Sequence, residues 1–199
     1  GLTKFENGKF SVYDSTNFPL DNATGFIETP YGDLIFSSDG TNTQTKEGSY
    51  IALYKNNVFK KIDESAGIKM QNASILSQHV ITSIDKDGNT WLAFSGVLTL
   101  NGSFKNTSGV LMYDGTKFHQ FTDFLDNFGK SQRPYSVHYS KELDKIFLTT
   151  MSSGFETFTL KDKSIYEFID GKWKPSNIIE NIKNKFDTKT GKILSDFHY

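Results

Sequence analysis

Short apolar runs separated by turn-forming residues are clearest along residues 78–122. Residues 80–84 (VITSI) are rich in β-branched side chains, and residues 90–94 (TWLAF) are apolar almost throughout. The polar segment 85–89 between them contains Asp-Gly and Gly-Asn steps, which accept the positive φ that a tight reversal needs. Because β-branched residues favour the half-buried surface of a sheet, this pattern predicts a β-hairpin.

A second hairpin is predicted directly after the first. Residues 110–113 (VLMY) form its first strand, Asp114 and Gly115 form its turn, and residues 117–121 (KFHQF) return. Two hairpins in series predict a unit of four short antiparallel strands.

Both hairpins recur along the chain. An aromatic residue, four residues with a turn signal and a second aromatic residue occur at Phe5–Phe10, Tyr54–Phe59, Tyr113–Phe118 and Phe168–Trp173. Segments with the spacing of the first hairpin occur at Ile27–Leu34, Ile84–Trp91, Tyr139–Ile146 and, more weakly, Phe186–Ile193. A period of roughly 50 residues is typical of propellers and arrays of small sheets.

The predicted fold class is therefore all-β: a β-propeller built of four-stranded antiparallel blades. The 199 residues hold about four blades' worth of sequence, and we expect them to form part of a larger ring, because most such rings have more than four blades. A β-sandwich of unrelated meanders also suits regularly spaced turn signals. Turns that match in register in two alternating hairpin types favour the propeller.

We treat residues 1–199 as one propeller segment. Its predicted parts are an outer hairpin at 1–14, full blades at 24–63, 78–122 and 134–175, and a C-terminal part at 176–199. We expect an inserted loop at 97–108, and outer strands of the last blade near 156–160 and 165–168.

The C-terminal part is ambiguous. Helical spacing of Ile178, Ile182 and Phe186 after a capping Ser176 favours a terminal helix. The turn signal at residues 190–192 (TGK) favours the inner hairpin of a further blade, which is our preferred interpretation. The chain starts at Gly1 within a repeat, so we expect a mature or excised segment.

Loop length predicts which face of such a propeller carries a site. The turns within hairpins are short, whereas the segments that join inner to outer hairpins and blade to blade are long: 15–23, 37–48, 64–77, 97–108 and 123–133. Binding residues are concentrated on loops held by a rigid scaffold. Extra loop length also costs little free energy, so simple tolerance of long loops explains the pattern equally well.

Polar residues stand where the predicted inner strands begin, on the long-loop face. Arg133 lies near Tyr135, Gln78 and His79 hold the equivalent place one blade earlier, and Asn22 does so in the blade before. These positions border the central channel, which is the concave site of a ring. A planar donor beside an aromatic ring suits a carboxylate or a sugar. The alternative is that these side chains hydrogen-bond neighbouring blades, because most side-chain donors serve structure.

The amino-acid composition narrows the classes of partner that the chain is expected to bind. The chain has 22 Lys and Arg against 23 Asp and Glu, a balance that favours neither nucleic acid nor an acidic membrane surface. No run of about 18 apolar residues is present, so no membrane contact is expected within this segment. The absence of cysteine excludes thiol catalysis, disulfides and zinc–thiolate sites.

The sequence offers no catalytic or metal-binding constellation. None of the four histidines, His79, His119, His138 and His198, has a partner at metal-ligand spacing, so we expect neither a metal nor a cofactor. The Asp-x-Asp-Gly at 85–88 lacks the later Glu of a calcium loop and is interpreted as turn chemistry. No nucleophile elbow or Gly-rich phosphate loop occurs, so no catalytic residue is predicted.

Residues in both hairpins of 78–122 carry a family resemblance. They are Ile81, Ile84, residues 87–92 (DGNTWL), residues 109–115 (GVLMYDG), Phe118 and Phe121. This pattern resembles the two-component regulator propeller repeat, and residues 1–5 (GLTKF) are similar to the start of its outer half. Residues 93–95 (AFS) depart from the small Gly-Thr step usual after the Trp, and the other copies lack the Trp.

The resemblance implies a bacterial periplasmic or extracellular sensor region that serves signal transduction, upstream of a histidine kinase or detached from one. It further implies an oligosaccharide or other small ligand and leaves a homodimer through the parent protein open. The family has no shared catalytic set. We therefore expect a non-catalytic propeller that binds a ligand or a partner, with a propeller enzyme (lyase or glycosidase) and a structural or dimerisation module as alternatives.

Overall fold

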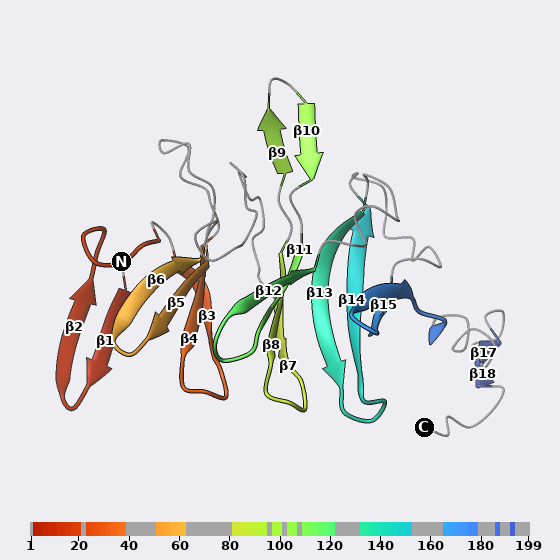
Figure 1. The fold of residues 1–199 in the computed structure, drawn as a ribbon, viewed down its shortest axis with the longest axis horizontal. Coiled ribbons are helices and arrows are strands. Elements are labelled where there is room, and N and C mark those ends of the chain that lie inside the picture. Colours follow the sequence, from red (N-terminus) through yellow and green to blue (C-terminus); the bar gives the residue numbers. More distant parts are fainter. Residues whose placement is uncertain are drawn as a thin grey trace.

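The computed structural model describes residues 2–20, 23–38, 51–62, 81–94, 97–100, 103–106, 109–121, 132–152, 165–178, 186–187 and 192–193. Every element that lies wholly within these ranges is a β-strand, and all strand pairs are antiparallel (Figure 1). The all-β prediction is confirmed for this part of the chain.

Three four-stranded sheets form the body of the structure. Sheet I consists of β3 (Ala23–Glu28), β4 (Leu34–Ser38), β5 (Ile51–Lys55) and β6 (Val58–Ile62). Sheet II consists of β7 (Ile81–Ile84), β8 (Thr90–Phe94), β11 (Gly109–Tyr113) and β12 (Phe118–Phe121). Sheet III consists of β13 (Gln132–Ser140), β14 (Lys145–Ser152), β15 (Ile165–Ile169) and β16 (Lys172–Pro175). Each is an up-and-down meander, so each contains an inner and an outer hairpin.

Three further hairpins pair outside these sheets. The N-terminal hairpin is β1 (Leu2–Glu6) with β2 (Lys9–Tyr13), and the C-terminal hairpin is β17 (Phe186–Asp187) with β18 (Lys192–Ile193). The third is β9 (Val97–Leu100) with β10 (Ser103–Asn106). It corrects the expectation of a loop at 97–108. The Asn-Gly step at 101–102, between the apolar positions Leu100 and Phe104, is a strong hairpin signal.

The four aromatic-flanked reversals share one geometry. In each copy the two aromatic residues are direct cross-strand partners: Phe5 with Phe10, Tyr54 with Phe59, Tyr113 with Phe118, and Phe168 with Trp173. Their ring centroids lie 4.7, 4.5, 4.7 and 5.0 Å apart, within the range of favourable aromatic pairs. The repeated outer hairpin is therefore confirmed.

The inner hairpins match the predicted spacing in part. Tyr139 pairs with Ile146, and Phe186 pairs with Ile193. The other two hairpins are shifted by one position, because Ile84 pairs with Thr90 and Glu28 pairs with Leu34.

Their five-residue loops cause the shift. A backbone hydrogen bond closes each one, from Asp85 N to Asn89 O (3.0 Å) and from Thr29 N to Asp33 O (2.8 Å). The fourth loop residue is a glycine in the left-handed region, with φ of 85° at Gly88 and 77° at Gly32. That conformation costs glycine little.

Sheet III corrects one predicted strand. β15 pairs directly with β14, with Phe147 opposite Glu167, so residues 165–169 form the third strand and β15–β16 is the outer hairpin. The predicted order of the outer strands is corrected, because residues 165–169 form the third strand and residues 172–175 the fourth, and the strand predicted near 156–160 lies outside the described ranges. At the C-terminus, Ser176 Oγ accepts a hydrogen bond from Ile178 N (3.1 Å), and Ile178 is helical. Residues 179–185 lie outside the described ranges.

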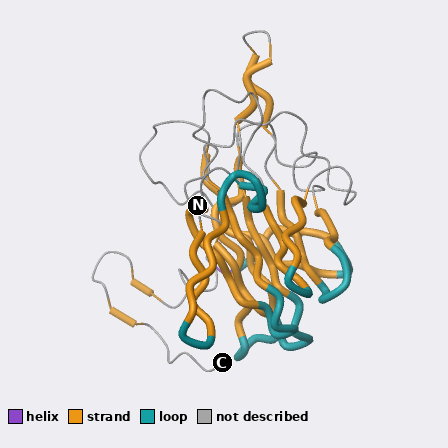
Figure 2. The backbone as a smooth tube through the Cα atoms, turned by 90° about the vertical axis from the view of Figure 1, so that its left-hand side faces the viewer, coloured by secondary structure: helices purple, strands orange, loops and turns teal. Residues whose placement is uncertain are grey.

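The sheets stack face to face in chain order (Figures 1 and 2). One side of sheet II, with Leu92, Leu111 and Tyr113, packs against Ile35 and Leu53 of sheet I. Its opposite side carries Trp91, Ala93 and Val110, which pack against sheet III at Val137, Leu148, Tyr166 and Trp173. The alternation of side chains along a strand thus places a core on both faces of sheet II.

The N-terminal hairpin continues the row. Leu2 and Tyr13 pack against the sheet I residues Phe36 and Ala52, together with Phe18 of the connecting segment. Within the described ranges the row does not close into a ring. The structure therefore shows stacked four-stranded sheets, and the closed propeller stays a prediction.

Candidate binding face and the contacts between sheets

The start of β13 carries two of the predicted site residues. Arg133 pairs with Met151 and Pro134 with Thr150, after which the register shifts and Ser136 pairs with Thr149. Tyr135 is thus the extra residue of a β-bulge. A bulge increases the local twist and redirects neighbouring side chains, and it also accommodates a proline within a ladder.

The same irregularity occurs two sheets earlier. In β3, Ala23 pairs with Ser38 and Gly25 with Ser37, which leaves Thr24 as the extra residue. Ile35 of β4 and Phe147 of β14 hold the same place opposite the outer hairpins of their sheets. Relative to these two residues, the register shift falls at the same position in β3, three residues before Glu28, as it does in β13. The bulge therefore recurs at the same position in sheets I and III.

Asn22, Gln78 and His79 lie outside the described residues. Each stands immediately before or close to a described inner strand in the sequence, at the end where the bulges occur. The structure thus brings Arg133 and Tyr135 to one bulged strand start and does not place the other three. Figure 1 shows this end of β13 on the same side as the β9–β10 hairpin, opposite the turns β3–β4, β7–β8 and β13–β14.

The turn side is occupied by a polar cluster between sheets I and II. Lys55 Nζ donates to Asp33 Oδ2 (2.9 Å), to the Tyr113 hydroxyl (3.1 Å) and to the Gly115 carbonyl (2.7 Å). The Tyr113 hydroxyl lies 2.7 Å from Asp33 Oδ2. Hydrogen bonds to Asp33 and then to Tyr113 raise the pKa of Lys55 to about 12. Burial, followed by the bond to Asp33, raises the pKa of Tyr113.

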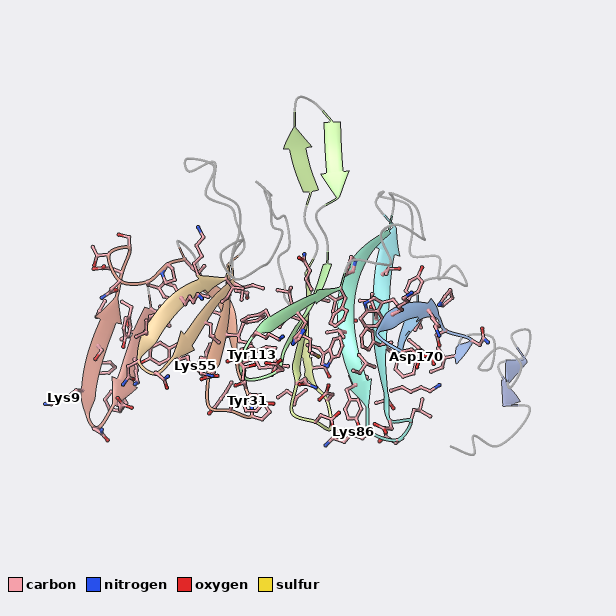
Figure 3. The ribbon with its side chains drawn as sticks, viewed as in Figure 1. Lys9, Tyr31, Lys55, Lys86, Tyr113 and Asp170 are labelled. Carbon is pink, nitrogen blue, oxygen red and sulfur yellow. The ribbon has the colours of Figure 1, made fainter. Side chains whose placement is uncertain are left out.

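Tyr31 completes this contact. It comes from the β3–β4 loop of sheet I, and its ring lies against Gly115 in the β11–β12 loop of sheet II (Figure 3). A Cβ at Gly115 would approach the Tyr31 ring to 2.8 Å, and Gly115 has a φ of 87°. Tyr31 also meets the Tyr113 ring edge-on, at 6.3 Å between centroids. Only glycine satisfies both the space and the backbone at position 115.

A second polar contact joins sheets II and III on the same side. Lys86 of the β7–β8 loop forms an ion pair with Asp144 of the β13–β14 loop. The Tyr139 hydroxyl donates to Asp144 Oδ1 (3.0 Å), and Tyr139 N donates to Ser83 Oγ (2.9 Å). The hydrogen bond from Lys86, and then that from Tyr139, lowers the pKa of Asp144. Both junctions between sheets are thus held at their turn ends.

The remaining carboxylates of the turns serve their own loops. Asp85 accepts hydrogen bonds from Asp87 N (3.0 Å), Asn89 N (2.9 Å) and Trp91 Nε1 (2.7 Å). Its interpretation as turn chemistry is confirmed. Within the described ranges, no group of three or more His, Asp or Glu side chains could hold a metal ion.

Asp114 likewise accepts hydrogen bonds from its own loop. Its carboxylate accepts from Thr116 N (2.8 Å) and Lys117 N (2.9 Å), and His119 Nε2 lies 2.7 Å from the second oxygen. Hydrogen bonds from the Thr116 hydroxyl and from His119 hold the pKa of Asp114 well below its usual range.

The chemistry of these clusters is structural. The three hydrogen-bond donors of the Lys55 ammonium are all engaged by protein acceptors, and Asp33 is buried. Sequence reasoning missed the cluster, because Asp33, Lys55 and Tyr113 are far apart in the chain and come from two repeats. The sequence did contain one signal for this cluster: among the four outer hairpins, only that of sheet I has a Lys, Lys55, directly after its first aromatic residue.

Comparison with protein-family models, with characterised proteins and with solved structures finds no match for this chain. Among the described residues, no helix is long and apolar enough to cross a membrane.

Proposed function

We propose that this chain is a β-propeller segment that binds a ligand or partner without catalysis, at the face where the inner strands begin. The observation that carries the proposal is the bulge that recurs at the start of β3 and of β13. Bulges are over-represented next to binding and active sites, where they re-aim side chains. Here they stand at the predicted position of Arg133 and Tyr135.

The proposal of a propeller rests on the order in which the sheets pack. Each sheet presents one face to the sheet before it and the opposite face to the sheet after it. Radial blades are arranged in this way. In a ring, the polar contacts between turns fix one side, which leaves the bulged side as the rim of the central channel.

The proposed class of ligand follows from the hydrogen-bond donors that Arg133 offers. Arg presents a planar fork of N–H donors, and a neighbouring aromatic ring stacks on sugar or guanidinium planes. An oligosaccharide, or another small ligand with a carboxylate, fits this chemistry best. Together with the repeat resemblance, this supports a role as a periplasmic or extracellular sensor region of a two-component regulator.

The test is calorimetric titration of an acidic and neutral oligosaccharide panel. We expect Arg133→Ala to weaken the best ligand at least about tenfold, because a hydrogen bond from a charged donor contributes roughly 1.5–3 kcal/mol. Lys172→Ala, at an exposed position of the outer strand β16, is the matched control and should leave the affinity unchanged.

Three results would contradict this function. Equal affinity of wild-type protein and the Arg133 variant would remove the proposed site, and the absence of any binding in the panel would remove the ligand class. Release of a cleaved or eliminated product would show an enzyme in place of a binding module.

A further inference from the structure

Thr90, the first residue of β8, carries a deeply buried hydroxyl group. The residue is 0% exposed, and its Oγ1 makes no hydrogen bond to any group in the described part of the chain. A hydroxyl group that folding removes from water without replacing its hydrogen bonds costs free energy. Because native proteins contain few such groups, each one points to a role or to a bound molecule such as an interior water.

The repeat does not require a hydroxyl group at this position. Thr90 pairs with Tyr113, the first aromatic residue of the outer hairpin in its sheet. Leu34 of sheet I and Ile146 of sheet III hold the equivalent place and are aliphatic. Both of these side chains pack against apolar clusters between sheets. The reason for the hydroxyl group of Thr90 therefore lies in the surroundings that this residue has in sheet II.

Those surroundings are the polar junction between sheets I and II. Directly paired residues of antiparallel strands point to the same face of a sheet. Thr90 therefore lies on the face that carries Tyr113 and Leu92 and packs against sheet I. From this face the Tyr113 hydroxyl reaches Lys55 and Asp33 (Figure 3). The buried hydroxyl of Thr90 thus belongs to the junction that a polar cluster holds together.

Two groups of sheet I can take part in further hydrogen bonds at this junction. The carboxylate of Asp33 is buried, and the bonds that it receives from the polar cluster both end on Oδ2, so Oδ1 keeps its lone pairs for another donor. The Tyr31 hydroxyl stands beside Gly88, two residues before Thr90, because a Cβ at Gly88 would lie 3.4 Å from it. A phenol can both donate and accept. The junction therefore offers partners for a small molecule that is bound to Thr90.

We propose that the hydroxyl of Thr90 binds one interior water molecule, which links sheet II to the polar groups of sheet I. A buried water typically makes about three hydrogen bonds to groups that are otherwise unsatisfied. A metal cation is disfavoured, because the ammonium of Lys55 already neutralises Asp33 at 2.9 Å. The site rests on the packing of two sheets and not on ligand binding at Arg133, so its failure would leave the oligosaccharide test untouched.

Magnetic relaxation dispersion of water oxygen tests the site, because it counts the water molecules that a protein holds inside for longer than it tumbles. Thr90→Val replaces the hydroxyl by a methyl group in a side chain of nearly the same shape and should remove one long-lived water from the wild-type count. Thr90→Ser keeps the hydroxyl and should keep the water. Thr149→Val is the matched control: the Thr149 hydroxyl lies 2.6 Å from Ser136 Oγ, so its loss should leave the count unchanged.

Stability distinguishes a bound water from a hydroxyl that has no partner at all. Loss of a water-bound hydroxyl removes a hydrogen bond, so Thr90→Val should lower the equilibrium constant for folding about fivefold, measured in urea. A hydroxyl without a partner gives the opposite sign, because an apolar group of the same shape removes the cost of burying it. A Thr90→Val variant that is more stable than the wild-type protein would therefore overturn the proposal.

Crystals of the wild-type protein give a result that does not depend on how a variant folds. The electron density should show an ordered water about 2.8 Å from Thr90 Oγ1, with a second contact to Asp33 or to Tyr31. Density without a water beside Thr90 Oγ1, or an unchanged count of long-lived waters in Thr90→Val, would contradict the site.

Discussion

At the scale of single residues, the turn side of the molecule is held by saturated polar groups. Lys55 gives all three of its donors to Asp33, Tyr113 and the Gly115 carbonyl, and the Asp114 carboxylate accepts from its own loop and from His119. Charge-assisted hydrogen bonds of this kind are stronger than neutral ones. They fix the conformation of the loops and the contacts between sheets.

The lowered pKa of Asp114 predicts a contribution to stability that depends on pH. The folded pKa lies below the ordinary value of 3.8, so the unfolded chain takes up the proton first as the pH falls. The contribution is complete above pH 3.8 and is lost progressively as the pH falls towards the folded pKa. Thermal unfolding followed from about pH 6 to about pH 2 should show a smaller loss of Tm in Asp114→Asn than in wild-type protein, by about 2–4 °C.

The matched control is Asp170→Asn. Asp170 has an 87% exposed side chain with a single ion pair to Lys174 at 3.3 Å, and exposed pairs contribute little. This variant should follow the wild-type curve. Parallel curves for the Asp114 variant and wild-type protein would remove the role assigned to that carboxylate.

At the scale of elements, the outer hairpins are alike in their aromatic pairs and differ in their turns. Asn7-Gly8 and Asp170-Gly171 are two-residue reversals with positive φ at both positions. The third copy uses a longer loop, in which Gly115 lies beneath Tyr31 of the neighbouring sheet. The same substitution at Gly8 and at Gly115 can therefore compare a turn that only reverses the chain with a turn that also packs against a neighbouring sheet.

Gly115→Ala should destabilise the protein more than Gly8→Ala. Both positions have positive φ, of 87° and 75°, and share a backbone cost of roughly 1–2 kcal/mol. At Gly8 a Cβ meets nothing within 4 Å, whereas at Gly115 it would meet the Tyr31 ring. Overpacking adds about 1–3 kcal/mol to the loss in free energy of unfolding, measured in urea. Tyr31→Ala in the Gly115→Ala background should recover part of that excess; equal losses at the two glycines would contradict the packing.

Sequence patterns predicted the elements better than their connections. The aromatic spacing placed Phe168 opposite Trp173 because cross-strand partners are fixed by a local turn. The one-residue shift at Ile84 was not predictable from spacing alone, since it depends on the hydrogen bond from Asp85 N to Asn89 O that closes a five-residue loop. Local turn chemistry thus sets the register. Counting the residues between apolar positions predicts the register only to within one residue.

At the scale of the whole molecule, repeated sheets stack in chain order. The sequence predicted the repeat but not the junctions, because Lys55 and Tyr113 meet only when two repeats are packed. For the candidate site, the sequence predicted Arg133 and Tyr135, and the structure adds the bulge at the start of their strand. The backbone irregularity could not be predicted, since a bulge depends on both paired strands.

The two tryptophans of the chain give the most direct test of this stacking. Trp91 belongs to sheet II and Trp173 to sheet III, and their rings meet edge-on with centroids 6.1 Å apart. Circular dichroism in the far-ultraviolet indole region should therefore show an exciton couplet in wild-type protein that disappears in both Trp91→Phe and Trp173→Phe. A wild-type spectrum equal to the sum of two independent indole contributions would show that sheets II and III do not stack, and would contradict the account.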